Sequence, residues 1–161
     1  MPPEMIDLDK MDNFVYPVRP ASASKIHGNI WMGGWIPPGF HVGAYFDCVV
    51  LCATEYQVPE CFIDVKVHQV HLKDDGSKMT KKEAFDAVKA AKKVIDWDKQ
   101  GLKVLVTCFA GRNRSGLVTA IALCKGQYNL PLSEATELIR NVRPNALVNP
   151  YFNKFLTKFC P

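Results

Sequence analysis

The chain has 161 residues, of which 48% are hydrophobic and 22% are charged, and its formal net charge at pH 7 is +4. This length and apolar content suffice for one globular domain with a hydrophobic core. No apolar run approaches the roughly 18 residues of a membrane-spanning helix, and residues 1–10 are acidic and polar, unlike a secretory signal.

The first part of the chain predicts an arm followed by strands. Residues 1–22 contain four prolines and predict an extended N-terminal arm in front of a single domain over residues 23–161. Residues 26–32 predict a strand that ends at two glycines, and the apolar residues 46–52 predict a central strand. Residues 65–72 alternate in character and predict a further strand.

A helix is predicted to begin after Thr80, because Glu83 follows three residues later and the two side chains can form a capping box. Gly101 is expected to end this helix. The predicted buried stripe consists of Phe85, Val88, Ala91 and Ile95. The many lysines around the helix are expected to form a solvated face, because aromatic residues are not interleaved with them as in a nucleic-acid-binding surface.

The C-terminal part predicts a strand over residues 102–107, a helix over residues 115–124 and two more helices. Ser133 is expected to cap the first of these two, whose apolar face contains Ala135, Leu138, Ile139 and Val142. Asn149 and Pro150 are expected to start the last, which is lined by Phe152, Phe155, Leu156 and Phe159. The order of elements predicts an α/β fold, with a central, mostly parallel or mixed sheet of four to five strands and helices on both faces.

The most informative motif lies between the strand 102–107 and the helix that follows. The run Val104-Leu-Val-Thr-Cys-Phe-Ala-Gly-Arg-Asn-Arg-Ser-Gly-Leu117 contains Cys108 and, six residues later, Arg114. A loop from the carboxyl end of a strand to the amino end of a helix is where open α/β sheets bind ligands, and amides at a helix start favour anions. Gly111 permits a tight turn in which successive N–H groups face one phosphate.

These residue types suit phosphate chemistry. An ordinary thiol has a pKa of about 8.5, and helix-start amides with a neighbouring guanidinium stabilise its nucleophilic thiolate form. Arg114 can hold two phosphate oxygens with its planar fork. Attack of the Cys108 sulfur on phosphorus gives a covalent cysteinyl-phosphate that water then hydrolyses. This chemistry requires no metal and no other cofactor, and we expect neither.

Residues 104–116 resemble the phosphate-binding loop of the cysteine-dependent protein tyrosine phosphatase superfamily, and the size of the chain resembles its compact dual-specificity branch. The resemblance covers most of residues 25–160, since residues 27–34 look like the family's first strand and residues 143–152 look like its closing helices. It implies a phosphatase fold and activity for this chain.

The resemblance also assigns roles. It implies that Cys108 is the nucleophile, that Arg114 binds phosphate and that Ser115 helps the thiolate leave in the second step. The amides of the phosphate-binding loop would come from Phe109, Ala110, Gly111, Arg112 and Asn113. One position departs from the family: a histidine usually precedes the cysteine, and this chain has Thr107. We expect this difference to affect the rate more than the reaction.

The departure of an alkoxide or phenoxide from phosphorus is aided by a positioned acid. Asp74 and Asp75 follow the predicted strand 65–72, and their position matches the general-acid loop of the resembled family. Alignment of the strand favours Asp74, whereas alignment of the turn with Gly76 favours Asp75, so both carboxylates remain candidates. Aspartate and glycine are also ordinary turn residues.

The predicted function is the hydrolysis of phosphotyrosine, together with phosphoserine and phosphothreonine, in a phosphorylated protein partner. An RNA 5′-triphosphatase is an alternative, because Asn113 to Gly116 also resemble the loop of such enzymes. Phosphoinositide phosphatases tend to carry extra lysines in the loop, where this chain has Arg112. A catalytically inactive phosphate-binding module is a further alternative, although such modules usually lose the cysteine or the arginine.

The six cysteines show neither disulfide-framework nor metal-site spacing. Apart from Cys108, they are expected to be small buried residues. Because a thiolate nucleophile also requires reducing surroundings, the expected location is the cytoplasm.

Overall fold

The computed structural model describes residues 5–6, 23–37 and 40–161, so most of the predicted arm over residues 1–22 lies outside the described residues. The strands are β1 (Met5–Ile6), β2 (Ala23–His27), β3 (Ile30–Gly33), β4 (Cys48–Leu51), β5 (Lys66–Gln69) and β6 (Val104–Thr107). The α-helices are α2 (Lys81–Lys99), α3 (Arg114–Lys125), α4 (Leu132–Val142) and α5 (Pro150–Phe159). Two short 3₁₀-helices, η1 (Val42–Ala44) and η2 (Pro59–Cys61), complete the described elements.

The strands form one mixed sheet in the order β1-β2-β3-β6-β4-β5. The strands from β3 to β5 in this order run parallel, whereas β1 and β2 join the edge antiparallel. The predicted α/β fold with a mixed sheet is confirmed, with the two-residue β1 as an added edge strand. In the register, Gly33 and Leu51 both lie beside Thr107. The loops after β3, β4 and β6 therefore leave the sheet at one edge, which is where such sheets bind ligands.

The single strand predicted over residues 26–32 is wrong, because a turn at Gly28 divides it into the antiparallel hairpin of β2 and β3. Gly28 has a φ of +57°, a left-handed conformation that glycine adopts without steric cost. A Cβ at this position would lie 1.7 Å from the hydroxyl oxygen of Tyr128. The apolar pattern did not reveal the turn, since residues on both sides of it are buried.

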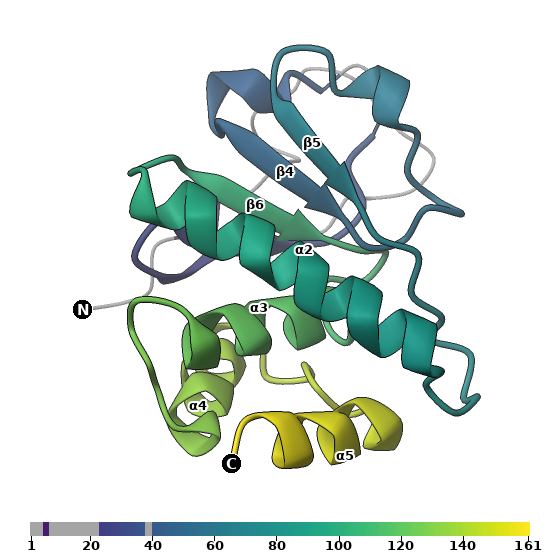
Figure 1. The fold of residues 1–161 in the computed structure, drawn as a ribbon. Coiled ribbons are helices and arrows are strands. Elements are labelled where there is room, and N and C mark those ends of the chain that lie inside the picture. Colours follow the sequence, from purple (N-terminus) through teal and green to yellow (C-terminus); the bar gives the residue numbers. More distant parts are fainter. Residues whose placement is uncertain (1–4, 7–22, 38–39) are drawn as a thin grey trace.

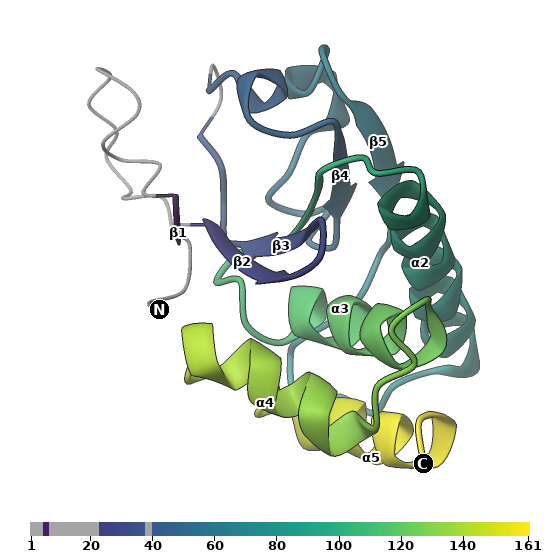
Figure 2. The same cartoon turned by 90° about the vertical axis from the view of Figure 1, so that its left-hand side faces the viewer.

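The four described α-helices pack against one face of the sheet (Figures 1 and 2). Helix α3 lies directly on β3 and β6, with α2 beside it and with α4 and α5 on its outer side. The other face is covered by η1 and by loop residues, including Ile36, Phe40, Phe46 and Phe62. Helical cover is thus present on both faces but is unequal. No described helix combines the length and apolar character needed to cross a membrane.

The capping predictions were correct where they depended on local hydrogen bonds. Thr80 and Glu83 form the capping box of α2, and Asn149 caps α5 by accepting hydrogen bonds from two backbone amides. Ser133 is not a cap, because α4 begins at Leu132, so that Pro131 holds the cap position two residues before Ser133. The N-terminus of α4 has no side-chain cap hydrogen bond.

The predicted buried stripe of α2 is wrong at Phe85, whereas Ala91 is buried as predicted and Val88 and Ile95 are half-buried against the core. Phe85 is 69% exposed, and the buried face contains the alanines Ala87, Ala90 and Ala91 together with Val94 and Trp97. Small side chains on this face allow α2 to approach its neighbours closely. A prediction based on the large apolar side chains does not detect such a face.

Candidate active site

Residues 108–114, which we call the phosphate loop, join β6 to α3 at the edge of the sheet where the parallel strands end. Cys108 is only 2% exposed, and its sulfur lies 3.2 Å from the hydroxyl oxygen of Ser115, in the first turn of α3. Gly111 makes the tight turn with a φ of +66°. The loop therefore holds the thiol beside the N-terminal, positive end of α3.

The guanidinium of Arg114 is buried next to this loop, and the residue is 8% exposed. Its Nη1 donates hydrogen bonds to the carboxylate of Glu55 and, at 3.3 Å, to the carbonyl oxygen of Leu72. Its Nε is buried and has no acceptor among the described residues. A buried donor without a partner is costly, so this N–H suits an acceptor supplied by a bound anion.

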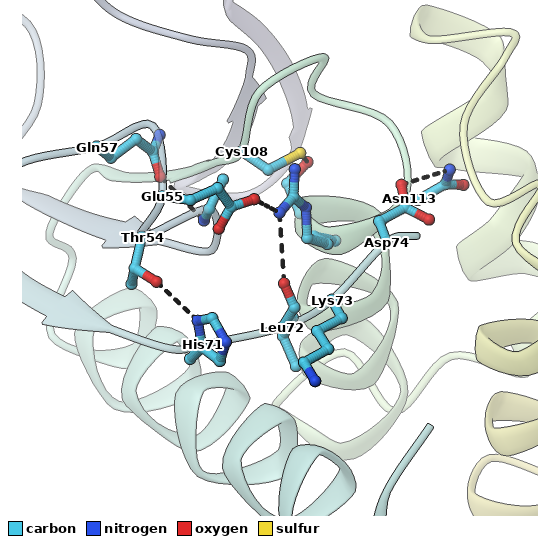
Figure 3. A network of polar contacts seen from close by, with 12 residues as sticks. Thr54, Glu55, Gln57, His71, Leu72, Lys73, Asp74, Cys108 and Asn113 are labelled. Atoms are coloured by element: carbon cyan, nitrogen blue, oxygen red, sulfur yellow. Dashed lines mark hydrogen bonds and ion pairs between the residues drawn. The ribbon is translucent and has the colours of Figure 1, made fainter. Parts of the chain in front are cut away.

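Glu55 belongs to the site although sequence reasoning missed it. It lies in the loop after β4, and Figure 3 shows its side chain directed toward the guanidinium. Desolvation raises the pKa of Glu55, but the hydrogen bond and charge of Arg114 outweigh it and hold the pKa below its ordinary value. The sequence did contain a signal for Glu55: it is an acidic residue shortly after a predicted central strand. Because β4 is parallel to β6, both strands end at the same edge of the sheet.

Thr107 occupies the position where the resembled family has histidine, and its hydroxyl both donates and accepts a hydrogen bond. It donates to the carbonyl oxygen of Gly34 at 2.6 Å and accepts from the side-chain amide of Gln57 at 2.9 Å. The oxygen of that amide accepts from the backbone N–H of Ala53 at 3.1 Å. Thr107 therefore ties the loops that follow β3 and β4 to the residue that precedes the thiol.

Arg143 holds the phosphate loop from its outer side. Its guanidinium donates to the carbonyl oxygens of Gly111 at 2.5 Å and Ala110 at 3.3 Å, and to the hydroxyl of Ser24 at 3.1 Å. Burial lowers the pKa of Arg143, although its attraction to Cys108 opposes the shift. Arg143 therefore engages two carbonyl oxygens in the middle of the phosphate loop and ties them to Ser24 of β2.

The two candidate acids occupy different environments. The carboxylate of Asp74 accepts a hydrogen bond from the side-chain amide of Asn113 at 3.0 Å (Figure 3) and another from that of Asn149 at 2.8 Å. Asp75 instead accepts from the backbone and hydroxyl of Ser77 within its own turn, and these bonds lower its pKa. Both residues are exposed, but Asp74 contacts Asn113 of the phosphate loop, whereas the hydrogen bonds of Asp75 go to Ser77 in its own turn.

The remaining loop residues form the rim of the site. Phe109 and Tyr56 are 43% and 49% exposed, and their ring centroids lie 4.5 Å apart. Ala110 and Arg112 are also exposed, while the carbonyl oxygen of Arg112 accepts from the backbone N–H of Leu147 at 3.3 Å. The exposed residues of the rim therefore include an aromatic pair, Phe109 and Tyr56, and a cation, Arg112.

Other cysteines differ from Cys108 in their surroundings. Burial raises the pKa of Cys48 to about 11 and raises the pKa of Cys52 well above its ordinary value. Cys124 and Cys160 are also buried, whereas the side chain of Cys61 lies outside the described residues. The prediction of small buried residues is confirmed for these four.

Comparisons with known proteins agree with this geometry. The family model of the dual specificity phosphatase catalytic domain matches residues 41–160. Among solved structures, Tk-PTP in the active form has a TM-score of 0.74 at 23% identity, covering 85% of this chain and 95% of that one. Human DUSP28 has a TM-score of 0.74 at 21% identity, covering 91% and 95%. PTPMT1 in complex with PI(5)P has a TM-score of 0.69 at 19% identity, covering 85% and 93%. No curated protein sequence matches significantly.

Proposed function

The chain belongs to the family of dual specificity phosphatase catalytic domains and is a cysteine-dependent phosphatase, and on this premise we propose that it dephosphorylates proteins. The proposed substrates are phosphotyrosine and, in addition, phosphoserine and phosphothreonine. The proposed reaction passes through a cysteinyl-phosphate at Cys108.

In the first step, the Cys108 thiolate attacks phosphorus and the bond from phosphorus to the leaving oxygen breaks. The phosphoryl oxygens bind the amides of the phosphate loop and the guanidinium of Arg114. The unpartnered Nε of Arg114 supports this role, since a phosphate oxygen is the acceptor it lacks among the described residues. Donors already fixed in position cost little reorganisation when charge develops at the transition state.

Asp74 is the proposed acid, which gives its proton to the leaving oxygen. The contact between Asp74 and Asn113 carries the proposal of a phosphomonoesterase, because it links the carboxylate to the phosphate loop itself. In the second step, ionised Asp74 takes a proton from water as the water attacks phosphorus. The hydroxyl of Ser115, 3.2 Å from the sulfur, donates to the departing thiolate.

The aromatic rim supports phosphotyrosine as a substrate. Phe109 directly follows Cys108, and its exposed ring packs against Tyr56. A phenyl ring attached to a phosphate in the loop can pack against this pair, and offset aromatic contacts contribute about 0.5–1.5 kcal/mol. The shorter side chains of phosphoserine and phosphothreonine gain less from the rim, so we expect them to be slower substrates.

Phosphoinositide is the second candidate substrate. The exposed Arg112 and the loop-holding Arg143 line a hollow of about 250 Å³ beside the phosphate loop, where a second phosphate group would find positive charge. The related fold of PTPMT1 has been solved in complex with PI(5)P. RNA 5′-triphosphate is disfavoured by Asp74, because its leaving group needs less assistance from an acid.

A substrate panel under reducing conditions tests the proposal. Purified protein is given phosphotyrosine and phosphoserine peptides, a phosphoinositide and 5′-triphosphorylated RNA, and released phosphate is measured. We expect the phosphotyrosine peptide to be hydrolysed fastest. Cys108→Ser should lower turnover by at least about 10³-fold, since a hydroxyl is far less ionised than a thiol. Preference for phosphoinositide or RNA would overturn the substrate class, and undiminished turnover in the serine variant would remove Cys108 as the nucleophile.

A further inference from the structure

A groove lies between the start of α2 and the length of α5, just beyond the loop that carries Asp74. It has a volume of about 420 Å³. One wall is formed by the segment leading into α2, with Lys78, Met79, Thr80, Lys81 and Ala84. The other wall is formed by α5, with Tyr151, Lys154, Phe155 and Lys158. Figure 1 shows α5 next to the N-terminal end of α2 on this side of the molecule.

The groove is connected to the active site through α5. Asn149, the cap of this helix, donates to Asp74, and Tyr151 of the groove follows two residues later. On the opposite wall, Lys78 lies four residues after Asp74 in the sequence. A polypeptide whose phosphorylated residue occupies the phosphate loop can therefore continue past Asp74 into the groove.

The walls of the groove carry four lysines and no acidic residue. Lys78 and Lys81 lie on one wall, facing Lys154 and Lys158 on the other, and all four are exposed. Within the described part of the chain, none of them forms an ion pair. Like charges one helical turn apart, as at Lys154 and Lys158, destabilise a helix slightly, and bound carboxylates would offset that repulsion.

Apart from Thr80 and the hydroxyl of Tyr151, the residues that line the groove between the lysines are apolar. Met79 and Phe155 are half-buried at its floor, and Ala84 leaves room between the walls. Such a floor suits one aliphatic side chain, and the two rows of ammonium groups suit carboxylates on either side of it. We propose that this groove binds an acidic segment of the phosphoprotein substrate, with an aliphatic residue between acidic ones. This inference rests on the proposed protein phosphatase function.

Two other macromolecules fit the groove less well. Single-stranded RNA binds proteins by stacking bases on exposed aromatic rings, whereas Tyr151 and Phe155 are half-buried. A membrane surface would engage protruding apolar residues, and the large exposed ones, such as Ile63 and Phe85, do not line the groove. A cationic groove with an apolar floor therefore favours a peptide.

Direct binding tests the groove without any chemistry at Cys108. The probe is a fluorescent, unphosphorylated peptide with a central leucine between two pairs of glutamates, and binding to the protein is followed by anisotropy. The variant Lys154→Ala/Lys158→Ala removes one row of charge. The matched control Lys89→Ala/Lys92→Ala removes the same charge from exposed positions of α2 outside the groove.

We expect the groove variant to weaken binding of this peptide about tenfold and the control variant to change it less than about twofold. Binding should also weaken as salt screens the charges. A peptide with glutamines in place of the glutamates should bind at least about fivefold more weakly to the unaltered protein. Equal weakening by both variants, or equal affinity for both peptides, would overturn the proposal.

Kinetics separate this proposal from the proposed function. For a phosphotyrosine peptide joined to the acidic segment, the groove variant should raise KM about tenfold without changing kcat, while turnover of a small aryl phosphate stays the same. Unchanged KM would overturn the groove proposal alone. Peptide binding through the lysines without hydrolysis of any phosphopeptide would overturn the proposed function alone. Tighter lysine-dependent binding of phosphoinositide vesicles or RNA would show that the occupant is not a peptide.

Discussion

The phosphate loop and the loop that carries the two aspartates are held in opposite ways. The phosphate loop lies between the buried strand β6 and the buried start of α3, and Thr107 and Arg143 fasten it from both sides. The aspartate loop, residues 73–78, is exposed throughout. Its carboxylate at Asp74 is held by the side-chain amides of two asparagines.

The two loops meet two different requirements of phosphoryl transfer. The nucleophile and its anion-binding amides must be in place before substrate arrives, and burial in the core provides that. An acid that serves leaving groups of different size can be held by a few exchangeable hydrogen bonds. Exposed segments with few contacts open at a low cost in free energy, so substitutions there should change turnover more than stability.

Replacement of the two aspartates should have the largest effect. Asp74→Asn should lower turnover of a phosphoserine peptide about 10²- to 10³-fold, because the leaving oxygen then departs without a proton. Asp75→Asn should change turnover less than about twofold, since Asp75 only closes its own turn with Ser77. Steady-state kinetics of both variants measure this. An equal loss in both, or a loss in Asp75→Asn alone, would contradict the assignment.

Alanine at a glycine in each loop compares their packing. In Gly111→Ala, an alanine would have to adopt a φ of +66°, and its Cβ would lie only 2.7 Å from a backbone carbon of Gly33. We therefore expect the free energy of unfolding to fall by about 2–3 kcal/mol. At Gly76 the φ is +84°, but no atom lies within 4 Å of the new Cβ. We therefore expect Gly76→Ala to lower the free energy of unfolding by about 1 kcal/mol. Thermal unfolding should show Tm falling by about 2–4 °C for each kcal/mol. Similar shifts would mean that the two loops are equally constrained.

Asn149 both caps α5 and donates a hydrogen bond to Asp74, and one substitution can separate these two roles. Asn149→Ser keeps an N-cap oxygen for α5 but removes the amide that donates to Asp74. We expect turnover to fall about tenfold while Tm changes by less than about 3 °C. In the background of Asp74→Asn, the serine should cause no further loss, because both changes act through one carboxylate. Additive losses would place the effect of Asn149 elsewhere.

The smallest expected effect is the pH-dependent contribution of Glu55 to stability. The pKa of Glu55 is lowered in the folded protein, so its pairing with Arg114 stabilises the fold above the ordinary glutamate pKa and loses this contribution as pH falls through the lowered value. Glu55→Gln should therefore lower Tm by up to about 3 °C at pH 7 and by less at pH 3. Glu60→Gln, on the exposed η2, is the control. A pH-independent difference would contradict the pairing.

Sequence reasoning succeeded where a few neighbouring residues determine the structure. The caps at Thr80 and Asn149 depend on hydrogen bonds within three residues, and both were predicted. The hairpin at Gly28 was missed, because the glycine turn interrupts a pattern that is apolar on both sides. The exposure of Phe85 on α2 was missed, because the position of the buried face depends on the surfaces of α3 and the sheet.

The same division applies to the site. The sequence by itself determined the kind of chemistry, because the thiol, the turn glycine, the arginine and the serine all lie within eight residues, from Cys108 to Ser115. Only the tertiary structure distinguished the surroundings of Asp74 from those of Asp75, added Glu55 and assembled the lysine groove. The contact of Asp74 with Asn149 joins residues 75 positions apart, and that of Glu55 with Arg114 joins residues 59 apart. Such contacts depend on how strands and helices pack, which no local pattern specifies.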